Sequence, residues 1–272
     1  MSDPLVLVLA RRAYAGSKAF ARLWRAGGPL LPPIFKGTLF GLSLLYVQIS
    51  SFAILPILLC VAVGSICYMQ PVTRSFTFGT SFFLVASLGL LLTSRFVITL
   101  PVALHAGIIG QIVFAAAFGV LFFILLGIKN QVLVRRRQWY SVLYIALIYG
   151  ISLLFFTSVT GEGALRHTLL LGIFSYLLLS EYFGVQAHPK SRALTLISLV
   201  HTLLAIQVAW AVSLLPIGFS KSASVLTLVL MMASSVTDRY LRGSLTALFL
   251  RRSVGLALLL IAVLLFSARL VI

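Results

Sequence analysis

Long apolar runs separated by short polar interruptions fill most of the sequence from residue 37 onward. A helix needs about 20 predominantly apolar residues to cross the hydrocarbon core of a bilayer, with a range of roughly 17–25. Most of the runs have this length, which predicts an all-α, polytopic transmembrane bundle. The apolar segments are 38–69, 77–94, 102–128, 139–158, 168–185, 193–217, 222–236 and 253–271.

Two of these segments do not have the length of one crossing. Residues 38–69 are too many for a single spanning helix, and residues 222–236 are few, although that segment can extend toward Tyr240. A hairpin within 38–69, with a polar turn near Gln48–Ser51 and Pro56 as a possible break, would return the chain to its starting side. We therefore expect about eight or nine membrane segments.

The Lys and Arg residues distinguish a single crossing from a hairpin. With a single crossing, they divide ten to eleven between the two sides of the membrane. With a hairpin, 17 of the 21 lie on the side of the N-terminus. Because cytoplasmic loops carry an excess of Lys and Arg, the sequence predicts the hairpin, a cytoplasmic N-terminus and a C-terminus on the opposite side.

The first 36 residues are predicted to form a basic membrane-surface arm, followed by a transmembrane helical domain over 37–272. At 100° per residue, four basic side chains of the arm share one helix face, opposite an apolar face. Such a helix lies in the headgroup layer and binds anionic lipids. Glycines and prolines at 27–33 are expected to end it. The basic residues of this face are Arg11, Lys18, Arg22 and Arg25.

The composition of the arm is compatible with two cellular membranes. A basic surface helix before a membrane bundle fits the bacterial inner membrane. An Arg-rich segment that is nearly free of acids also resembles a mitochondrial transit peptide, so an organellar inner membrane is the alternative.

Composition agrees with a membrane protein and excludes several functions. The chain is 61% hydrophobic and 9% charged, whereas soluble domains carry about 25% charged residues. The net charge of +17 lies in short clusters between apolar runs, which favours lipid headgroups over nucleic acid. The sequence has no P-loop, no H-E-x-x-H and no G-x-S-x-G motif. With only four acidic residues, we predict no metal site and no cofactor.

Two ionisable residues within the apolar segments are candidates for a function. His201 is well inside its segment, where a polar group is costly and is a functional hypothesis by default. It is either a proton relay or a neutral histidine bonded to a neighbouring helix. Glu181 lies near the cytoplasmic end of 168–185, where it is either a structural salt bridge or a proton or cation site.

Small residues recur every three or four positions in two segments, as in closely packed membrane helices. Gln111 and Ser198 lie on these stripes, so the stripes indicate either a tightly packed bundle or a substrate path lined by these two side chains. Together with Gln48 in the hairpin and His201, they form a candidate intramembrane polar site. The stripes are Ala103, Gly107, Gln111, Ala115 and Gly119, and Ser198, Thr202, Ala205, Ala209 and Ser213.

Polar residues between the segments give weaker signals. Asp238 and Arg242 have the i, i+4 spacing of a helical ion pair, as do Glu162 and Arg166. Residues 237–252 are expected to lie along the membrane or to bind a partner, and His167 is expected in a loop.

Three functions fit this pattern. The first is a non-enzymatic transport or assembly subunit of a larger membrane complex, with lipids and other membrane subunits as partners. The second is a proton-coupled transporter of small solutes or lipids that uses Glu181 and His201. The third is a metal-free enzyme that acts on lipid-linked substrates.

Overall fold

The computed structural model describes residues 30–50, 53–69, 78–99, 107–130, 132–133, 135–158, 164–187 and 191–269. All regular elements among these residues are α-helices, as predicted. They are α2 (Leu31–Ile49), α3 (Ile54–Met69), α4 (Gly79–Thr99), α5 (Gly107–Lys129), α6 (Arg136–Ser158), α7 (Ala164–Ala187), α8 (Ser191–Ser213), α9 (Phe219–Leu241) and α10 (Ala247–Arg269).

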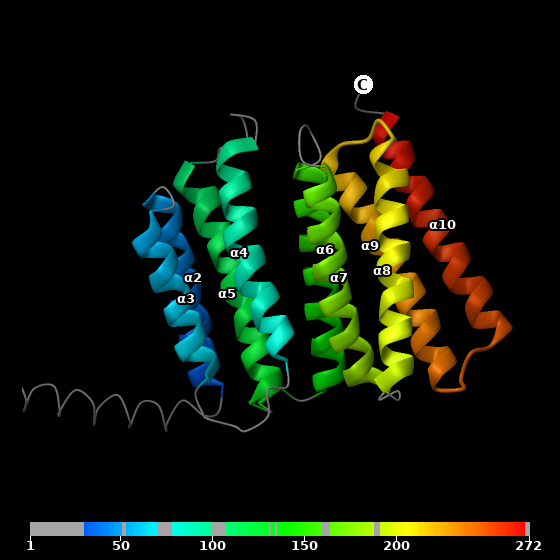
Figure 1. Cartoon of the computed structure of the whole chain (residues 1–272), viewed down its shortest axis with the longest axis horizontal. Helices are drawn as coiled ribbons and strands as arrows, with labels where there is room; N and C mark the ends of the chain where they lie inside the picture. The colour runs from blue at the N-terminus through cyan, green and yellow to red at the C-terminus, as the bar shows by residue number, and fades with distance from the viewer. Residues whose placement is uncertain are drawn as a thin grey trace, which may run out of the picture.

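The helices run alternately up and down in one bundle, so that α2 begins at the lower end and α10 finishes at the upper end (Figure 1). Six of the described helices contain a stretch long and apolar enough to cross a membrane. The chain is therefore a polytopic helical membrane protein. The six candidate spans are Ile109–Lys129, Arg136–Thr157, Ala164–Gln186, Arg192–Ser213, Phe219–Leu241 and Ala247–Leu264.

The apolar run 38–69 is divided between two helices, which confirms the hairpin. Helix α2 ends at Ile49 and α3 begins at Ile54, and the two helices pack against each other. The break lies where the predicted turn was placed. At the end of α2, the backbone N–H of Ser50 donates to the carbonyl of Tyr46 at 3.0 Å.

Three prolines that were expected to break helices lie in the first turns of helices instead. Pro32 and Pro33, which were expected to help end the arm, lie in the first turn of α2. Pro56, considered as a break, is the third residue of α3. Proline suits the first turn because the N–H groups there have no partner within the helix. Helix α2 therefore begins at Leu31, inside the range assigned to the arm.

Three further expectations are resolved. The extension of 222–236 toward Tyr240 is confirmed, because α9 continues to Leu241. Residues 237–252 do not form one surface segment, since they include the end of α9, a turn and the start of α10. His167 lies in the first turn of α7 and not in a loop.

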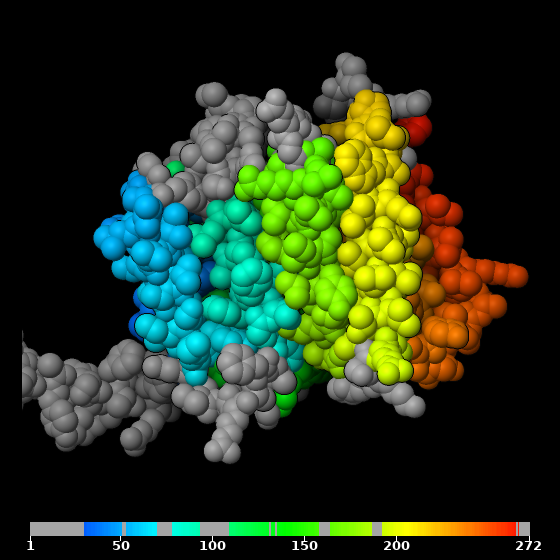
Figure 2. Space-filling view, viewed as in Figure 1, coloured from blue at the N-terminus to red at the C-terminus, as the bar shows by residue number. Residues whose placement is uncertain are grey.

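The tightest packing joins α2 to α5, and the main core lies among α4, α5, α6 and α7. Fully buried side chains of this core include Phe122, Leu125, Tyr140 and Phe183. Many large apolar side chains point outward, as in a protein solvated by lipid. Figure 2 shows α3, α4, α7 and α8 side by side on one such outer face, with α10 at the edge.

Candidate functional site

Glu181, on α7, lies at the N-terminal end of α4 and contacts groups from α4 and α6. Its Oε2 accepts the backbone N–H of Ser81 at 3.0 Å, and its Oε1 accepts both the Ser81 hydroxyl and the Tyr140 hydroxyl, the latter at 3.0 Å. Three donors suit an ionised carboxylate, which accepts and does not donate. The first N–H groups of a helix lack partners and carry partial positive charge. Glu181 of α7 therefore caps α4.

His201 occupies a separate position between α7, α8 and α9. Its Nδ1 lies 2.9 Å from the carbonyl oxygen of Ile197, and its Nε2 lies 3.2 Å from the hydroxyl of Thr237. A carbonyl only accepts, so Nδ1 carries a proton, while the Thr237 hydroxyl can donate to Nε2 or accept from it. Phe183 contacts the ring edge to face, with centroids 5.0 Å apart. Both ring nitrogens of His201 therefore have hydrogen-bond partners within the protein.

Consecutive residues of α7 separate these two polar groups. Tyr182 stacks on Tyr144 at 4.0 Å and lies over Tyr140 at 6.3 Å, while Phe183 faces His201. Neighbouring helical positions point about 100° apart, so Glu181 and Phe183 face different sides of α7. An aromatic layer thus lies between Glu181 and His201, with no hydrogen bond between them.

The remaining candidates of the predicted polar site lie on three helices, of which α2 and α5 pack against each other while α8 lies elsewhere in the bundle. Gln48 is on α2, Gln111 is half-buried on α5, and Ser198 is on α8 with His201. Helix α8 packs against α7 and α9, so the structure does not bring the five candidates together. The Oε1 of Gln48 and the Oγ of Ser198 are buried without a hydrogen-bond partner among the described residues.

Most of the described residues of the small-residue stripes lie at helix contacts. Ser198, Thr202, Ala205 and Ala209 are all buried on α8. Ala115 and Gly119 of α5 lie against α2, and their partners there are glycines that do not belong to either predicted stripe. The stripes therefore account for close helix contacts and not for a shared path lined by Gln111 and Ser198.

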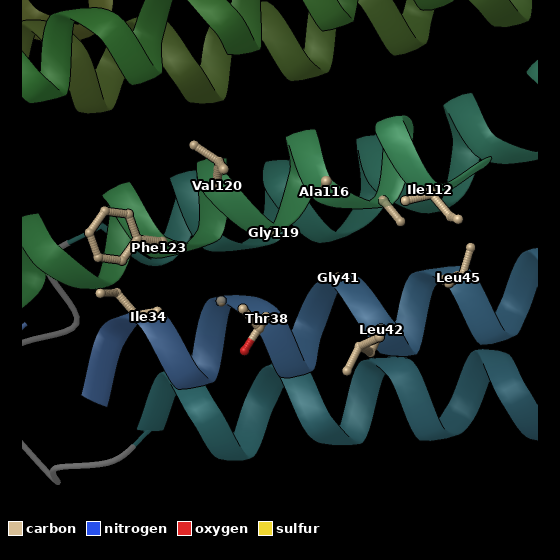
Figure 3. Close-up of a pocket in the computed structure, with 12 residues that line it drawn as sticks. Ile34, Thr38, Gly41, Leu42, Leu45, Ile112, Ala116, Gly119, Val120 and Phe123 are labelled. Atoms are coloured by element: carbon tan, nitrogen blue, oxygen red, sulfur yellow. The ribbon is translucent and has the colours of Figure 1, made fainter. Parts of the chain in front are cut away.

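An apolar groove runs along the contact of α2 with α5 (Figure 3). Its volume is about 580 Å³, and Thr38 contributes the one hydroxyl group of its lining. That hydroxyl donates to the carbonyl of Phe35 at 2.8 Å. The candidate polar site predicted from the sequence combined the hairpin with the helices of Gln111 and His201. The groove lies on the hairpin and on α5, but α8 does not contribute to it.

Two lysines at the lower end of the bundle form hydrogen bonds that the sequence analysis did not predict, because it considered only their charge. Lys36 donates to the carbonyl of Cys67 at 3.1 Å, and Lys129 donates to that of Tyr68. Both lysines therefore bind the C-terminal end of α3. Lys129 is the last residue of α5 and Lys36 lies in the second turn of α2, and this position near helix ends was the signal that could have predicted their role.

The ion pair expected from its spacing is present at the same end. Arg242 lies 2.8 Å from Asp238. The other expected pair involves Glu162, which is outside the described residues, as are the headgroup-binding candidates Arg11, Lys18, Arg22 and Arg25. The described part of the chain contains no group of three or more His, Cys, Asp or Glu side chains that could hold a metal ion.

Comparison with known proteins adds no family: the chain matches no protein-family model, no curated protein and no solved structure.

Proposed function

We propose that this protein is a non-enzymatic subunit of a larger membrane complex, with a role in transport or assembly, and that α10 binds a transmembrane helix of another subunit. The exposed position of α10 carries this proposal. Among the described residues of α10, Ala257 alone is buried, and α9 is the helix on which α10 packs. Figure 1 shows α10 at the outer edge of the bundle.

The face of α10 opposite Ala257 has the pattern of a helix-packing seam. Its residues alternate small and large at intervals of four and three, as along the contact line of paired helices. A Cβ added to Gly255 would meet no atom within 4 Å. An unpacked glycine costs a helix about 1 kcal/mol relative to alanine, and lipid chains gain nothing from it, whereas a second helix can approach closely there. The seam comprises Gly255, Leu259, Ala262 and Phe266, all exposed.

Site-specific crosslinking tests this seam in native membranes. A photocrosslinking residue at Leu259 is expected to join one particular membrane protein, and the double variant Gly255→Leu/Ala262→Leu is expected to abolish that product. Ala211 is an exposed small residue of α8, so Ala211→Leu is the matched control and should leave the product unchanged. Crosslinks from Leu259 only to lipid, or only to a second copy of this chain, would refute binding to another subunit.

We also propose which side of the membrane the N-terminus faces and which lipids the arm binds. The N-terminal end faces the cytoplasm, because the hairpin gathers most Lys and Arg at that end. The arm binds anionic headgroups through its basic face. A bacterial inner membrane is the first choice, and an organellar inner membrane is the alternative.

The other two functions have less support from the geometry. Glu181 and His201 are each satisfied by protein groups, and neither lines the groove between α2 and α5. A proton-coupled transporter would require a pH-dependent flux that Glu181→Gln abolishes in proteoliposomes. A metal-free enzyme would require loss of turnover of a lipid-linked substrate in His201→Leu with the fold retained.

A further inference from the structure

Two guanidinium groups from different helices meet at the C-terminal end of α7. The Nη2 of Arg137, on α6, donates to the backbone carbonyl of Gln186 at 3.1 Å. The Nη2 of Arg242, just after α9, donates to the same carbonyl at 3.3 Å and to the Gln186 side chain at 3.0 Å. The negative end of the α7 dipole thus holds two like charges close together.

This cluster lies at the level of the membrane headgroups. The candidate spans Arg136–Thr157, Ala164–Gln186 and Phe219–Leu241 all begin or end within one residue of it. Trp139, half a turn beyond Arg137, is exposed, and tryptophan is typical of the membrane–water boundary.

The two guanidinium groups of this cluster are only partly neutralised by nearby carboxylates. Asp238 accepts from the Nε of Arg242 at 2.9 Å, whereas no described carboxylate lies within ion-pair distance of Arg137. A guanidinium carries five donors, and the Gln186 contact uses one of those of Arg137. Arg137 is also exposed, so its remaining donors face the surroundings of the protein.

We propose that Arg137 and Arg242 bind the phosphate group of an anionic membrane lipid. The planar fork of a guanidinium matches the oxygens of a phosphate, which accept two parallel hydrogen bonds. Basic pockets between transmembrane helices at the cytoplasmic boundary bind anionic headgroups for the same reason. The depth of the cluster favours a lipid over a soluble phosphate compound. This lipid site stands whether or not α10 binds another subunit.

The amount of anionic lipid retained by the full-length protein tests whether this site is occupied. The protein is placed in nanodiscs of phosphatidylcholine with a minor fraction of phosphatidylglycerol, and bound lipid is counted by native mass spectrometry. Arg137→Gln is expected to lower phosphatidylglycerol retention about fivefold, as loss of one interfacial basic residue predicts. Arg137→Lys keeps the charge but loses the fork, so its retention should be intermediate. Unfolding in phosphatidylcholine alone verifies that both variants are folded.

The matched control is Arg251→Gln, which removes an exposed arginine from the start of α10 at the same end of the bundle. It should leave retention unchanged. Equal losses in Arg251→Gln and Arg137→Gln would show general surface charge and overturn the site, as would full retention in Arg137→Gln. Displacement of phosphatidylglycerol by millimolar inorganic phosphate, with equal binding of that ion in uncharged nanodiscs, would overturn a lipid as the ligand.

Discussion

Adding one methyl group to Gly41 is expected to push α2 away from α5. A Cβ at this position would lie 2.9 Å from the carbonyl oxygen of Ala115 and 3.5 Å from the Cα of Gly119. Both atoms belong to the backbone of α5, which cannot rotate away as a side chain can. Overpacking of this kind costs about 1–3 kcal/mol.

The higher helix propensity of alanine partly offsets this cost in the free energy of unfolding. Alanine is favoured over glycine in a helix interior by up to about 1 kcal/mol. The free energy of unfolding of Gly41→Ala should therefore fall by up to about 2 kcal/mol. Gly184→Ala is the matched control, because a Cβ there would have Leu194 Cδ2 as its nearest atom, at 3.9 Å. That variant has room for the methyl group and should be more stable by up to about 1 kcal/mol.

Unfolding of the detergent-solubilised protein, followed by far-ultraviolet circular dichroism, measures both variants under one condition. The two substitutions are chemically identical, so they should shift the unfolding midpoint in opposite directions. Gly119→Ala repeats the test from α5, since its Cβ would lie 2.9 Å from the carbonyl oxygen of Gly37. Stabilisation of all three variants to the same extent would refute the close contact of α2 with α5.

Two further predictions concern Glu181 and the topology. Glu181→Gln is expected to lower the free energy of unfolding by about 2 kcal/mol, since an amide nitrogen cannot accept from the donors of α4 and α6. Asp238→Asn removes a partly exposed ion pair and should cost at most about 1 kcal/mol in the same assay, and equal effects would contradict the capping role. Cysteines at positions 2 and 272, in a chain lacking Cys60 and Cys67, should be labelled from opposite sides of the membrane. Labelling from the same side would contradict the charge-based topology.

The helical hairpin was predictable because two independent rules agreed on it. Length alone showed that 38–69 exceeds one crossing, and the distribution of Lys and Arg selected a return to the starting side. Neither rule locates the start of α2. Pro32 and Pro33 were interpreted as helix breakers, although proline also suits the first turn of a helix. The sequence alone does not show whether a helix ends before these prolines or begins at them.

The polar site was less predictable than the fold. The position of a residue in an apolar segment indicates its depth in the membrane but not which neighbouring helix its side chain faces. His201 was expected at depth within its helix, and one of its two interpretations was a bond to a neighbouring helix. The structure provides that bond from Thr237. Grouping His201 with Gln48 and Gln111 required knowledge of which helices are neighbours. Small residues do show that some pair of helices approaches closely, but not which pair it is.

The charged residues at the lower end are explained by the shortness of α3 as well as by topology. Its 16 residues rise about 24 Å, less than the roughly 30 Å of a hydrocarbon core. The last carbonyls of such a helix lack partners within the helix, and leaving them bare near lipid is costly. Lys36 and Lys129 bring ammonium groups to these carbonyls, and Lys129 also lies 3.6 Å above the Tyr68 ring. Two of the charges on which the predicted orientation rests therefore also complete the backbone hydrogen bonding of α3.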